Sequence, residues 1–355
     1  MLIKYKLGDV VKVRSERVDN PASCSYDKFV GLEHYVSGEI EIKKYGDTSL
    51  LKSAMKVFKS GDILVARRNV YLKRASIVKF DGITSGDSIV LHVENKLLRK
   101  IIPFVLNTDD FWEYAEKFSD GTMSKRLSPK VLLEYEFMLP EIDKLEKLAE
   151  LLWAANDTKE AYKKLLNITD ELVKAQFIEM FGDITDNPFN WTVNEWKDVL
   201  LIQNGKNQKH VVDEKGIYPI YGSGGVIGYA NEFTCPENTV IIGRKGTINK
   251  PIFVKEKCWN VDTAFGIIPD LNKIHFLYLY WFCILYDFEK HNRAAVLPSL
   301  TKGDLLKINM QVPPIKIQYE FADFVKHTDK SKHELEQNIY NLEKTIKALM
   351  VKNFG

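Results

Sequence analysis

The longest regular pattern of apolar and polar residues in the chain extends from Glu141 to Met180. This stretch contains no glycine or proline, and its apolar residues recur at intervals of three and four, with glutamate and lysine between them. The periodicity predicts a long amphipathic helix whose narrow apolar stripe packs against a partner helix. Pro140 precedes the stretch and Gly182 follows it, as expected for the two ends of a helix. The stripe consists of Leu145, Leu148, Leu152, Ala155, Tyr162, Leu166 and Val173, with Lys159, Thr169 and Gln176 as weaker members.

A second stripe with the same register begins 173 positions later. Both stretches follow a proline, and both end in Phe-Gly, at Gly182 and at Gly355. A match of register alone could be coincidence between two unrelated surface helices. The helix, the preceding proline and the final Phe-Gly at one offset favour an internal tandem repeat. The second stripe consists of Gln318, Phe321, Val325, Thr328, Lys332, Leu335, Ile339, Leu342, Ile346 and Leu349.

The repeat divides the 355 residues into two globular regions that alternate with two long helices. A chain of this length ordinarily forms two or three domains. We therefore expect an α+β protein with two β-rich domains and two helices that pair with each other. The expected segments are a first globule at 1–140, a first helix at 141–183, a second globule at 184–313 and a second helix at 314–355.

Within each globule, short β-rich runs separated by glycine and aspartate turns come first, and helical patterns follow. In the first globule the pattern changes from strand to helix after Pro103. Strands are expected at 10–13, 40–42, 63–65, 76–80 and 88–93, and at 218–221, 226–229, 239–242, 252–254 and 264–268. Helices are expected at 109–118, at 128–133, at 276–288 and from Thr301.

The net charge of +2 and the pI near 8.1 are low for a protein that binds nucleic acid by itself. Three explanations stay open: the protein does not bind nucleic acid, its basic residues gather on one face, or a partner supplies part of the positive charge. The four cysteines are scattered, which suggests neither a disulfide framework nor a zinc site. Since the chain also has no long apolar run and no apolar segment near its first residue, we expect a cytoplasmic protein without a membrane span.

One basic run stands out in the first globule, between two expected strands. It brings four cations and an aromatic ring into one loop, where they could contact phosphates or base edges. The alternative is a solvated hairpin tip. Arg67 and Arg244 occupy corresponding places, each in the loop after an apolar strand. The run contains Arg67, Arg68, Tyr71, Lys73 and Arg74.

The glycine runs of the second globule do not match nucleotide-binding motifs. The segment from Gly222 to Gly228 lacks the GxGxxG spacing, and Gly243-Arg-Lys-Gly246 is not a Walker A loop. We interpret both as tight turns that bring the backbone near a ligand. Asn187-Pro-Phe-Asn190 lacks the second proline of the adenine methyltransferase motif, and no catalytic serine, zinc-protease or metal-ligand spacing is found. These observations indicate a binding protein without a catalytic site or a cofactor.

Local motifs in both globules, together with the repeat, resemble the specificity subunit of type I restriction–modification enzymes. In the second globule they are Tyr218-Pro-Ile-Tyr-Gly-Ser-Gly-Gly-Val-Ile-Gly-Tyr229 and Ile241-Ile-Gly-Arg-Lys-Gly246. In the first globule they are Gly31-Leu-Glu-His34, Phe58-Lys-Ser-Gly-Asp-Ile-Leu64 and Met123-Ser-Lys-Arg126. The resemblance extends over the whole chain.

The resemblance implies two target recognition domains, each of which reads one half of a bipartite sequence in double-stranded DNA. The two helices would pair as an antiparallel coiled coil and set the gap between the half-sites. Two methyltransferase (modification) subunits and the restriction (motor–nuclease) subunits would join the complex and supply the chemistry. The expected DNA contacts are His34, Arg67, Arg68, Tyr71, Lys73, Arg74, Lys125 and Arg126 in the first globule, and Tyr221, Ser223, Arg244, Lys245, Arg293 and Lys302 in the second.

Two other classes of function compete with this interpretation. The chain could be a scaffold whose coiled coil binds proteins and whose globules are docking modules; binding that is insensitive to salt, or no binding to DNA, would favour that class. It could also be a stand-alone methyltransferase or nuclease, which the missing catalytic motifs disfavour.

Overall fold

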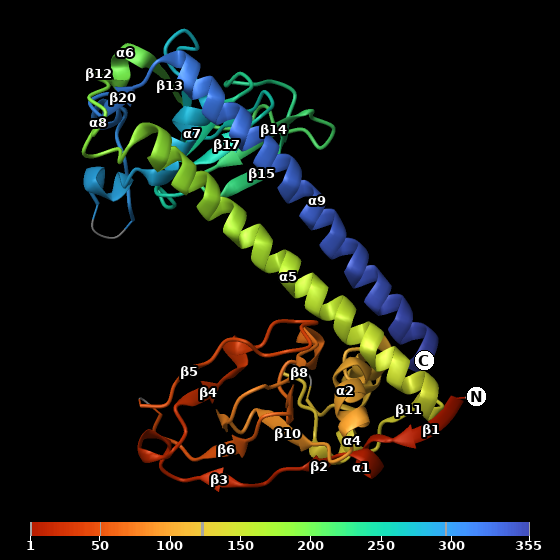
Figure 1. Cartoon of the computed structure of the whole chain (residues 1–355). Helices are drawn as coiled ribbons and strands as arrows, with labels where there is room; N and C mark the ends of the chain where they lie inside the picture. Colours follow the sequence, from red (N-terminus) through yellow and green to blue (C-terminus); the bar gives the residue numbers. More distant parts are fainter. Residues whose placement is uncertain (1, 50, 122–123, 295–296, 355) are drawn as a thin grey trace. The chain divides into compact units, whose positions relative to one another are not determined.

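The computed structural model describes residues 2–49, 51–121, 124–294 and 297–354. The chain forms two compact units, which are described separately (Figure 1). Unit 1 consists of residues 1–163 and 336–355, and unit 2 consists of residues 164–335. Two helices of 40 residues each, α5 (Ile142–Phe181) and α9 (Ile315–Phe354), contribute one segment to each unit.

The described residues of unit 1 form a four-stranded antiparallel sheet in the order β2-β10-β7-β8 and a five-stranded sheet in the order β3-β6-β9-β4-β5, and β1 pairs with β11. The strands are β1 (Leu2–Lys6), β2 (Lys12–Val13), β3 (Arg17–Val18), β4 (Lys28–Val30), β5 (Gly46–Asp47), β6 (Met55–Phe58), β7 (Ile63–Ala66), β8 (Ala75–Ile77), β9 (Gly82–Thr84), β10 (Ser88–His92) and β11 (Glu136–Pro140). The helices are α1 (Leu7–Val10), α2 (Lys96–Val105), α3 (Asp109–Phe118) and α4 (Pro129–Leu133), with 3₁₀ turns η1 (Pro21–Ser23), η2 (Leu32–His34) and η3 (Val70–Leu72).

The core of unit 1 lies between its four-stranded sheet and its helices. All residues of β7 are buried, as expected for a short run of aliphatic residues in the interior of a sheet. Side-chain caps fix where the helices begin, since Asn95 accepts from the amides of Leu97 and Leu98 at the start of α2. The core also contains buried residues of the two long helices: Leu145, Leu148 and Leu152 of the α5 stripe, and Ile346, Met350 and Phe354 of α9.

Unit 2 has a four-stranded antiparallel sheet in the order β13-β19-β16-β17 and a three-stranded sheet in the order β15-β14-β18, and β12 pairs with β20 in the part that the structure describes. The strands are β12 (Thr192–Glu195), β13 (Leu200–Asn204), β14 (Tyr218–Gly222), β15 (Gly225–Ala230), β16 (Thr239–Gly243), β17 (Ile252–Val254), β18 (Trp259–Asn260), β19 (Ala264–Pro269) and β20 (Asn309–Val312). The helices are α6 (Trp196–Val199), α7 (Phe276–Leu285) and α8 (Lys302–Leu305), with the 3₁₀ turn η4 (Phe288–His291).

Aromatic rings pack against one another in the core of unit 2. Tyr278 of α7 stacks on Phe177 of α5 with ring centroids 5.3 Å apart, and Phe321 of α9 meets Phe177 edge to face at 5.4 Å. Val173 and Val325 are also buried there, so both predicted stripes supply core residues to this unit. Each fully buried side chain of this size contributes about 1.5–3 kcal/mol of burial free energy.

Most predicted elements are present, with small shifts at their ends. The first long helix was predicted at 141–180 and spans Ile142–Phe181, and the helix at Asp109–Phe118 has the predicted bounds. The predicted strand at 40–42 is wrong. That segment makes one isolated bridge, because both of its main-chain bonds go to Ile77: Ile77 donates to the Ile40 carbonyl at 2.8 Å, and Ile42 donates to the Ile77 carbonyl at 3.0 Å.

Other boundaries also differ from the prediction. The strand predicted at 76–80 is β8, which starts one residue earlier and ends at Ile77. Helix begins before Pro103, not after it, because α2 starts at Lys96 and contains Pro103. The Asn95 cap and the buried residues that follow it compensate for the hydrogen bond that proline cannot donate. The predicted strand at 10–13 begins later, since Val10 ends α1, and the aromatic helix α7 ends at Leu285, before Phe288. None of the described helices combines the length and apolar character needed to cross a lipid bilayer.

Candidate nucleic-acid interface

Two basic stretches that are far apart in sequence lie together in unit 1. The β7–β8 connection carries Arg67 and Arg68, and the chain returns beside it at Lys125 and Arg126. The Asn69 amide donates to the Lys125 carbonyl at 3.1 Å, and the Leu127 amide donates to the Arg67 carbonyl at 2.8 Å. These bonds hold the two basic stretches side by side. Met123, which belongs to the second predicted motif, lies outside the described residues.

Asp87 orients two of these arginines. Its carboxylate lies 3.5 Å from Nη1 of Arg68 and 3.4 Å from Nη2 of Arg126. The two arginine side chains are 45% and 50% exposed, so each keeps part of its guanidinium in solvent. A guanidinium has five N–H donors. Both side chains are therefore held in place while most of their donors face outward.

The backbone of the same connection presents an aromatic ring. Asn69 and Lys73 have φ values of 54° and 46° and flank η3, in which Val70 is buried. Left-handed residues on both sides make the connection tight. Tyr71, the residue after the buried valine, is 61% exposed, and a solvent-facing ring of this kind can stack on a base or contact a sugar.

Four of the predicted contacts in unit 1 are engaged with the protein itself. Arg74 donates from Nη1 to the Leu32 carbonyl at 3.0 Å and from Nη2 to the Arg68 carbonyl at 3.1 Å, and burial lowers the pKa of its guanidinium. Lys73 pairs with the Asp109 carboxylate at 2.9 Å. Lys125 donates to the Glu116 carbonyl at 3.0 Å. The His34 ring is 16% exposed and accepts the Gly31 amide at 2.9 Å. These four side chains therefore bond to groups of the protein and do not project freely into solvent.

Sequence reasoning missed two cations near this surface. Arg17 of β3 lies opposite Lys56 of β6 in the ladder. Burial lowers the pKa of Lys56, and the positive charges of Arg67 and Arg17 lower it further, which places the three cations near one another. The Lys56 ammonium donates to the Ser88 carbonyl at 2.6 Å. Isolated charges on separate strands carry no local sequence signal, and only the sheet brings them to Arg67.

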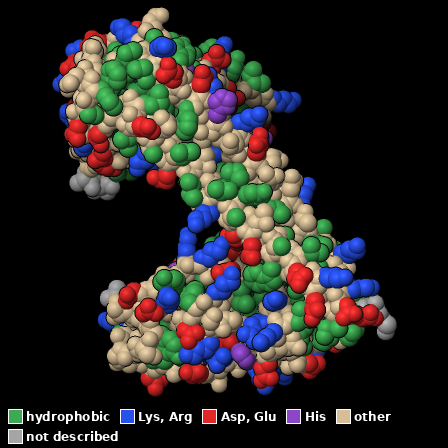
Figure 2. Space-filling view, viewed as in Figure 1, with side chains coloured by type: hydrophobic (Ala, Val, Ile, Leu, Met, Phe, Trp, Pro, Cys, Tyr) green, Lys and Arg blue, Asp and Glu red, His purple; other side chains and the backbone are tan. Residues whose placement is uncertain are grey.

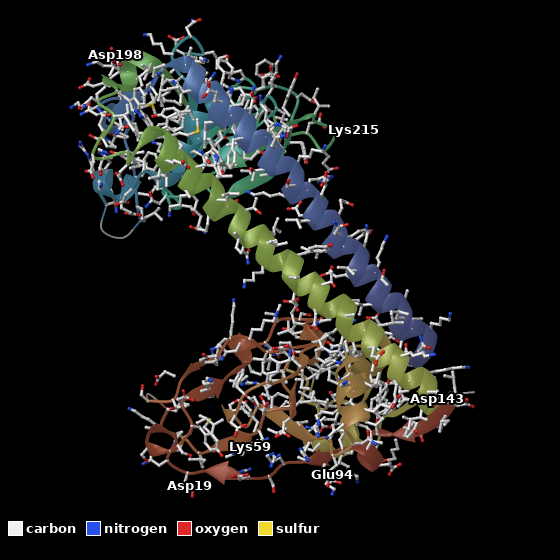
Figure 3. The ribbon with its side chains drawn as sticks, in the orientation of Figure 1. Asp19, Lys59, Glu94, Asp143, Asp198 and Lys215 are labelled. Atoms are coloured by element: carbon white, nitrogen blue, oxygen red, sulfur yellow. The ribbon has the colours of Figure 1, made fainter. Side chains whose placement is uncertain are left out.

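Lys59 of unit 1 is engaged with other groups of the protein. Lys59, labelled in Figure 3, lies after β6, where its ammonium donates to the Tyr26 hydroxyl at 2.6 Å and pairs with Asp81 at 3.2 Å. Positive and negative side chains are interspersed over the visible face of both units (Figure 2). This mixture agrees with the net charge of +2.

In unit 2, the β14–β15 hairpin tip touches the connection that follows β16. A Cβ atom on Gly243 would lie 2.1 Å from the Thr247 carbonyl oxygen and 3.0 Å from the Ser223 Cβ. Only glycine therefore fits at this position, and the close approach places Ser223 beside Arg244 and Lys245. Tyr221 is half-buried at the same hairpin, and burial raises the pKa of its hydroxyl.

Arg244 is exposed but well supported. Its amide donates to the Thr263 carbonyl at 2.8 Å, and its carbonyl accepts the Leu300 amide at 2.9 Å. Nη1 donates to the Asp262 carbonyl at 3.3 Å, and the guanidinium lies 5.8 Å from the centre of the Phe265 ring. This support holds the side chain over the sheet with most of its donors free.

The other predicted cations of unit 2 differ in their availability. Lys245 is exposed, and its backbone bridges to Ser299. Arg293 pairs with the Asp304 carboxylate while its side chain stays 67% exposed. Lys302 donates to the Ile202 carbonyl at 2.7 Å and is less exposed. We therefore rank Arg244 and Lys245 above Lys302 as candidates for contact with nucleic acid.

Arg67 and Arg244 hold corresponding backbone positions. The Arg67 amide donates to the Asp87 carbonyl at 2.9 Å, just before β10, and the Arg244 amide donates to Thr263, just before β19. The carbonyl of each arginine accepts an amide from the loop that precedes the next short helix, from Leu127 and from Leu300 respectively. Each unit thus presents an arginine loop on the same framework of main-chain bonds.

The sequence is similar to those of known DNA specificity proteins of type I systems. Residues 188–344 match the family model for the type I restriction modification DNA specificity domain. The Mycoplasma pneumoniae protein named type I specificity subunit S.MpnORF285P is 25% identical over 151 residues, which are 40% of this chain and 49% of that protein. The specificity subunit of the Escherichia coli type I restriction enzyme EcoDI is 21% identical over 154 residues, 42% of this chain and 34% of that subunit. The matched regions thus span half or less of the length of either relative.

Two solved structures share the fold over nearly the whole chain. The S subunit of a type I restriction–modification system from M. genitalium has a TM-score of 0.62 at 16% identity, covering 100% of this chain and 96% of that one. A chain from a study of assembly and conformational transition in a type I system has a TM-score of 0.60 at 17% identity, covering 99% of this chain and 97% of that one. The predicted resemblance to type I specificity subunits is therefore confirmed, and residues 188–344 match the model of the type I restriction modification DNA specificity domain.

Proposed function

We propose that the chain is the sequence-recognition subunit of a type I restriction–modification enzyme and that each unit reads one half of a bipartite target in double-stranded DNA. The observation that carries the proposal is the pair of supported arginine loops, at Arg67 in unit 1 and at Arg244 in unit 2. Arginine is the side chain that most often reads a base edge, through two parallel bonds to guanine. Two such loops on corresponding frameworks suit a target with two half-sites.

Equivalent architecture in the two units supports a tandem repeat. The main sheets have the orders β2-β10-β7-β8 and β13-β19-β16-β17, and each unit also has one parallel strand pair, β4 with β9 and β14 with β18. In this proposal, residues 1–140 and 184–313 are the target recognition domains. Residues 141–183 and 314–355 are the helices that set the gap between the half-sites.

Contacts between α5 and α9 support an antiparallel coiled coil. In unit 1, Lys163 of α5 lies 3.9 Å from Glu343 of α9. In unit 2, a residue later in α5, Asp170, pairs with a residue earlier in α9, Lys332. The order of contacts runs in opposite directions along the two helices. Half-buried stripe positions such as Leu166 and Ile339 suit a narrow helix–helix seam.

The chemistry belongs to other subunits in this proposal. Two methyltransferase subunits and the restriction subunits join the chain, and the chain itself is not catalytic. The names of the relatives support such partners, since they are specificity subunits of type I enzymes. A net charge of +2 also suits a protein whose partners supply part of the positive charge that contacts the DNA phosphates.

The proposal is tested by co-expressing the chain with the candidate modification subunit of its host and mapping methylated adenines in the genome by long-read sequencing. We expect a bipartite motif with a fixed gap. Exchanging residues 1–140 for those of a related subunit should change one half of the motif, and exchanging residues 184–313 should change the other half. Absence of both a complex and new methylation would contradict the proposal and would favour the scaffold function.

A further inference from the structure

In unit 1, the edge of the four-stranded sheet is covered by a segment of the same chain. Edge strand β8 ends at Ile77, whose amide and carbonyl bond to Ile40 and Ile42 at 2.8 and 3.0 Å. Both isoleucines are 3% exposed. A short segment, residues 39–42, therefore lies along the outer side of β8 at Ile77.

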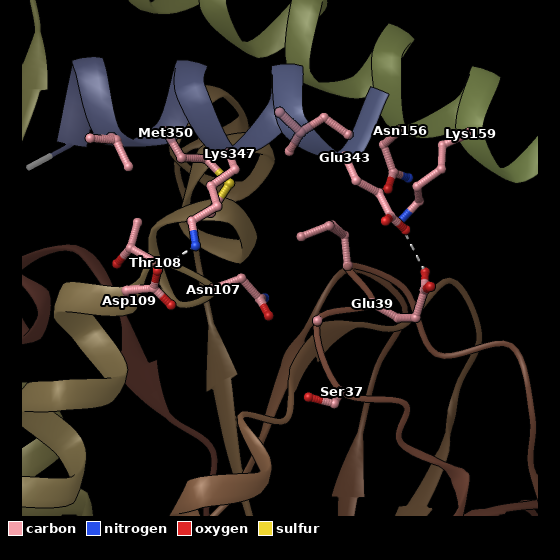
Figure 4. A pocket seen from close by; sticks show the side chains of 14 residues that line it. Ser37, Glu39, Asn107, Thr108, Asp109, Asn156, Lys159, Glu343, Lys347 and Met350 are labelled. Carbon is pink, nitrogen blue, oxygen red and sulfur yellow. Dashed lines mark hydrogen bonds and ion pairs between the residues drawn. The ribbon is translucent and has the colours of Figure 1, made fainter. Parts of the chain in front are cut away.

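Two carboxylates of this segment are paired with lysines. Glu39 accepts from Lys159 of α5 at 3.3 Å and also pairs with Lys163, and Figure 4 shows it directed toward Lys159. Glu41 pairs with Lys79, two residues beyond the edge residue Ile77, at 2.6 Å. The Glu-Ile-Glu-Ile sequence of the segment thus combines two buried apolar side chains with two carboxylates that make three ion pairs.

The corresponding space in unit 2 is open. Strand β17 is the edge of its sheet, and Phe253 faces Val240 as Ile77 faces Ile63. In the part of unit 2 that the structure describes, no strand pairs with the outer side of β17. A groove of about 600 Å³ lies beside it, which we call the β17 groove. Its apolar lining includes Ile252, Phe253, Tyr280, Trp281 and Ile284. Its charged lining consists of Lys174 and Lys332 together with Asp170, Glu171 and Asp329.

The apolar part of the β17 groove contains an exposed aliphatic residue. Ile284 is 40% exposed although it belongs to the most apolar helix of the unit. An exposed aliphatic side chain beside an open sheet edge suits a groove that accepts a further chain.

The lysines around the groove match those that hold the segment in unit 1. Lys332 lies 173 positions after Lys159, and Lys255 lies two residues beyond Phe253 as Lys79 lies beyond Ile77. In unit 2 these lysines pair with carboxylates of the helices instead. Lys332 pairs with Asp170, and Lys255 lies 3.7 Å from Asp329 with its side chain 75% exposed. A carboxylate of an incoming segment would therefore exchange with Asp170 at Lys332 and with Asp329 at Lys255.

We propose that the β17 groove binds an extended segment of a partner protein in which acidic residues alternate with β-branched apolar residues. The segment adds to the outer side of β17 as a further strand through main-chain hydrogen bonds. Its apolar side chains contact Trp281 and Ile284, and its carboxylates pair with Lys332 and Lys255. This site is separate from the arginine loops, so the inference does not depend on DNA recognition.

The probe for this site is a fluorescein-labelled peptide with the sequence of residues 37–43, Ser-Gly-Glu-Ile-Glu-Ile-Lys. We expect saturable binding to the full-length chain by fluorescence anisotropy. Lys332→Glu and Lys255→Glu should each weaken it about five- to tenfold, because each reverses one charged pair. Lys330→Glu is the matched control, an exposed lysine of the same helix outside the groove lining, and should leave binding unchanged. In a second peptide, glutamine replaces both glutamates. Its affinity for the wild-type chain should be as low as the affinity of the unmodified peptide for the two groove variants.

Hydrogen exchange provides a second measurement that does not depend on the variants. Bound peptide should slow exchange of the amides at 252–254, on β17. Slowed exchange at 75–77 instead would mean that the peptide displaces the segment of unit 1, and that result would overturn the proposal. Absence of saturable binding, or binding that both groove variants leave unchanged, would overturn it as well.

Discussion

Replacement of Arg244 is the most direct test of whether the unit 2 loop reads DNA sequence. The side chain uses one guanidinium donor on the Asp262 carbonyl and rests against Phe265. It is therefore ordered before DNA arrives, and little rotamer entropy remains to be lost on binding. A bidentate contact to a base is worth about 1–3 kcal/mol. Because of this preordering, we expect Arg244→Ala to lose about 2 kcal/mol, which is roughly a 30-fold weaker affinity.

The assay is fluorescence anisotropy with the chain bound to its modification subunits and with a duplex that contains the mapped target. Measurements at several salt concentrations separate the two roles of an arginine. Loss of a base contact leaves the salt dependence unchanged, whereas loss of a phosphate contact reduces the slope of log K against log salt by about 0.9. Arg244→Lys should lose nearly as much affinity as the alanine variant, since lysine cannot form two parallel bonds to a base.

Lys250→Ala is the matched control, because Lys250 is exposed in the same connection between β16 and β17. It should leave affinity for the target nearly unchanged. An Arg244→Ala variant that melts at the wild-type temperature and binds the target with wild-type affinity would refute the reasoning. A reduced salt slope with discrimination between targets intact would assign Arg244 to a phosphate.

Three further predictions concern stability and local structure. Lys347 and Lys73 lower the pKa of Asp109 to about 2, below its unfolded value of 3.8, so its stabilising effect is present above about pH 4 and is lost as the pH falls toward 2. Asp109 is 43% exposed, so Asp109→Asn should lower the free energy of unfolding by about 1 kcal/mol at pH 7. In urea melts, this difference from the wild type should shrink as the pH falls toward 2. Gly243→Ala should lower the melting temperature by several degrees, because its Cβ would collide with a carbonyl oxygen 2.1 Å away; an unchanged melting temperature would contradict this. Arg74→Ala should lower the melting temperature, because its guanidinium donates to two main-chain carbonyls, whereas Tyr71→Ala should weaken DNA binding without a change in melting temperature.

The candidate site was only partly accessible to sequence reasoning. The connection from Arg67 to Arg74 was expected to be a basic loop, and the structure shows that its residues have unequal roles. Arg68 is half exposed, whereas Arg74 is anchored on main-chain carbonyls. Both are arginines in the same run, so composition could not separate them. Their difference comes from Leu32, a residue far away in sequence that supplies one of the carbonyls to Arg74.

The same limit explains the incorrect strand at 40–42. Its alternation of isoleucine and glutamate is a strand pattern, and both isoleucines are indeed buried. Alternation indicates which side chains face inward, but a strand also needs a partner long enough to form a ladder. The segment reaches only the last residue of β8, so one bridge forms. Whether a ladder forms depends on where the neighbouring strand ends.

The sequence by itself determined the features that depend on neighbours within one or two turns of the chain. These are the two long amphipathic helices, most strands of the two main sheets, and the positions of the arginine loops between strands. Such features follow from periodicities that the backbone imposes locally. Tertiary structure alone decided which cations stay free, how Arg17 and Lys56 come near Arg67, and why β8 is covered while β17 borders a groove. Each of these depends on side chains and main-chain groups that meet only after distant segments pack, so no local pattern in the sequence records them.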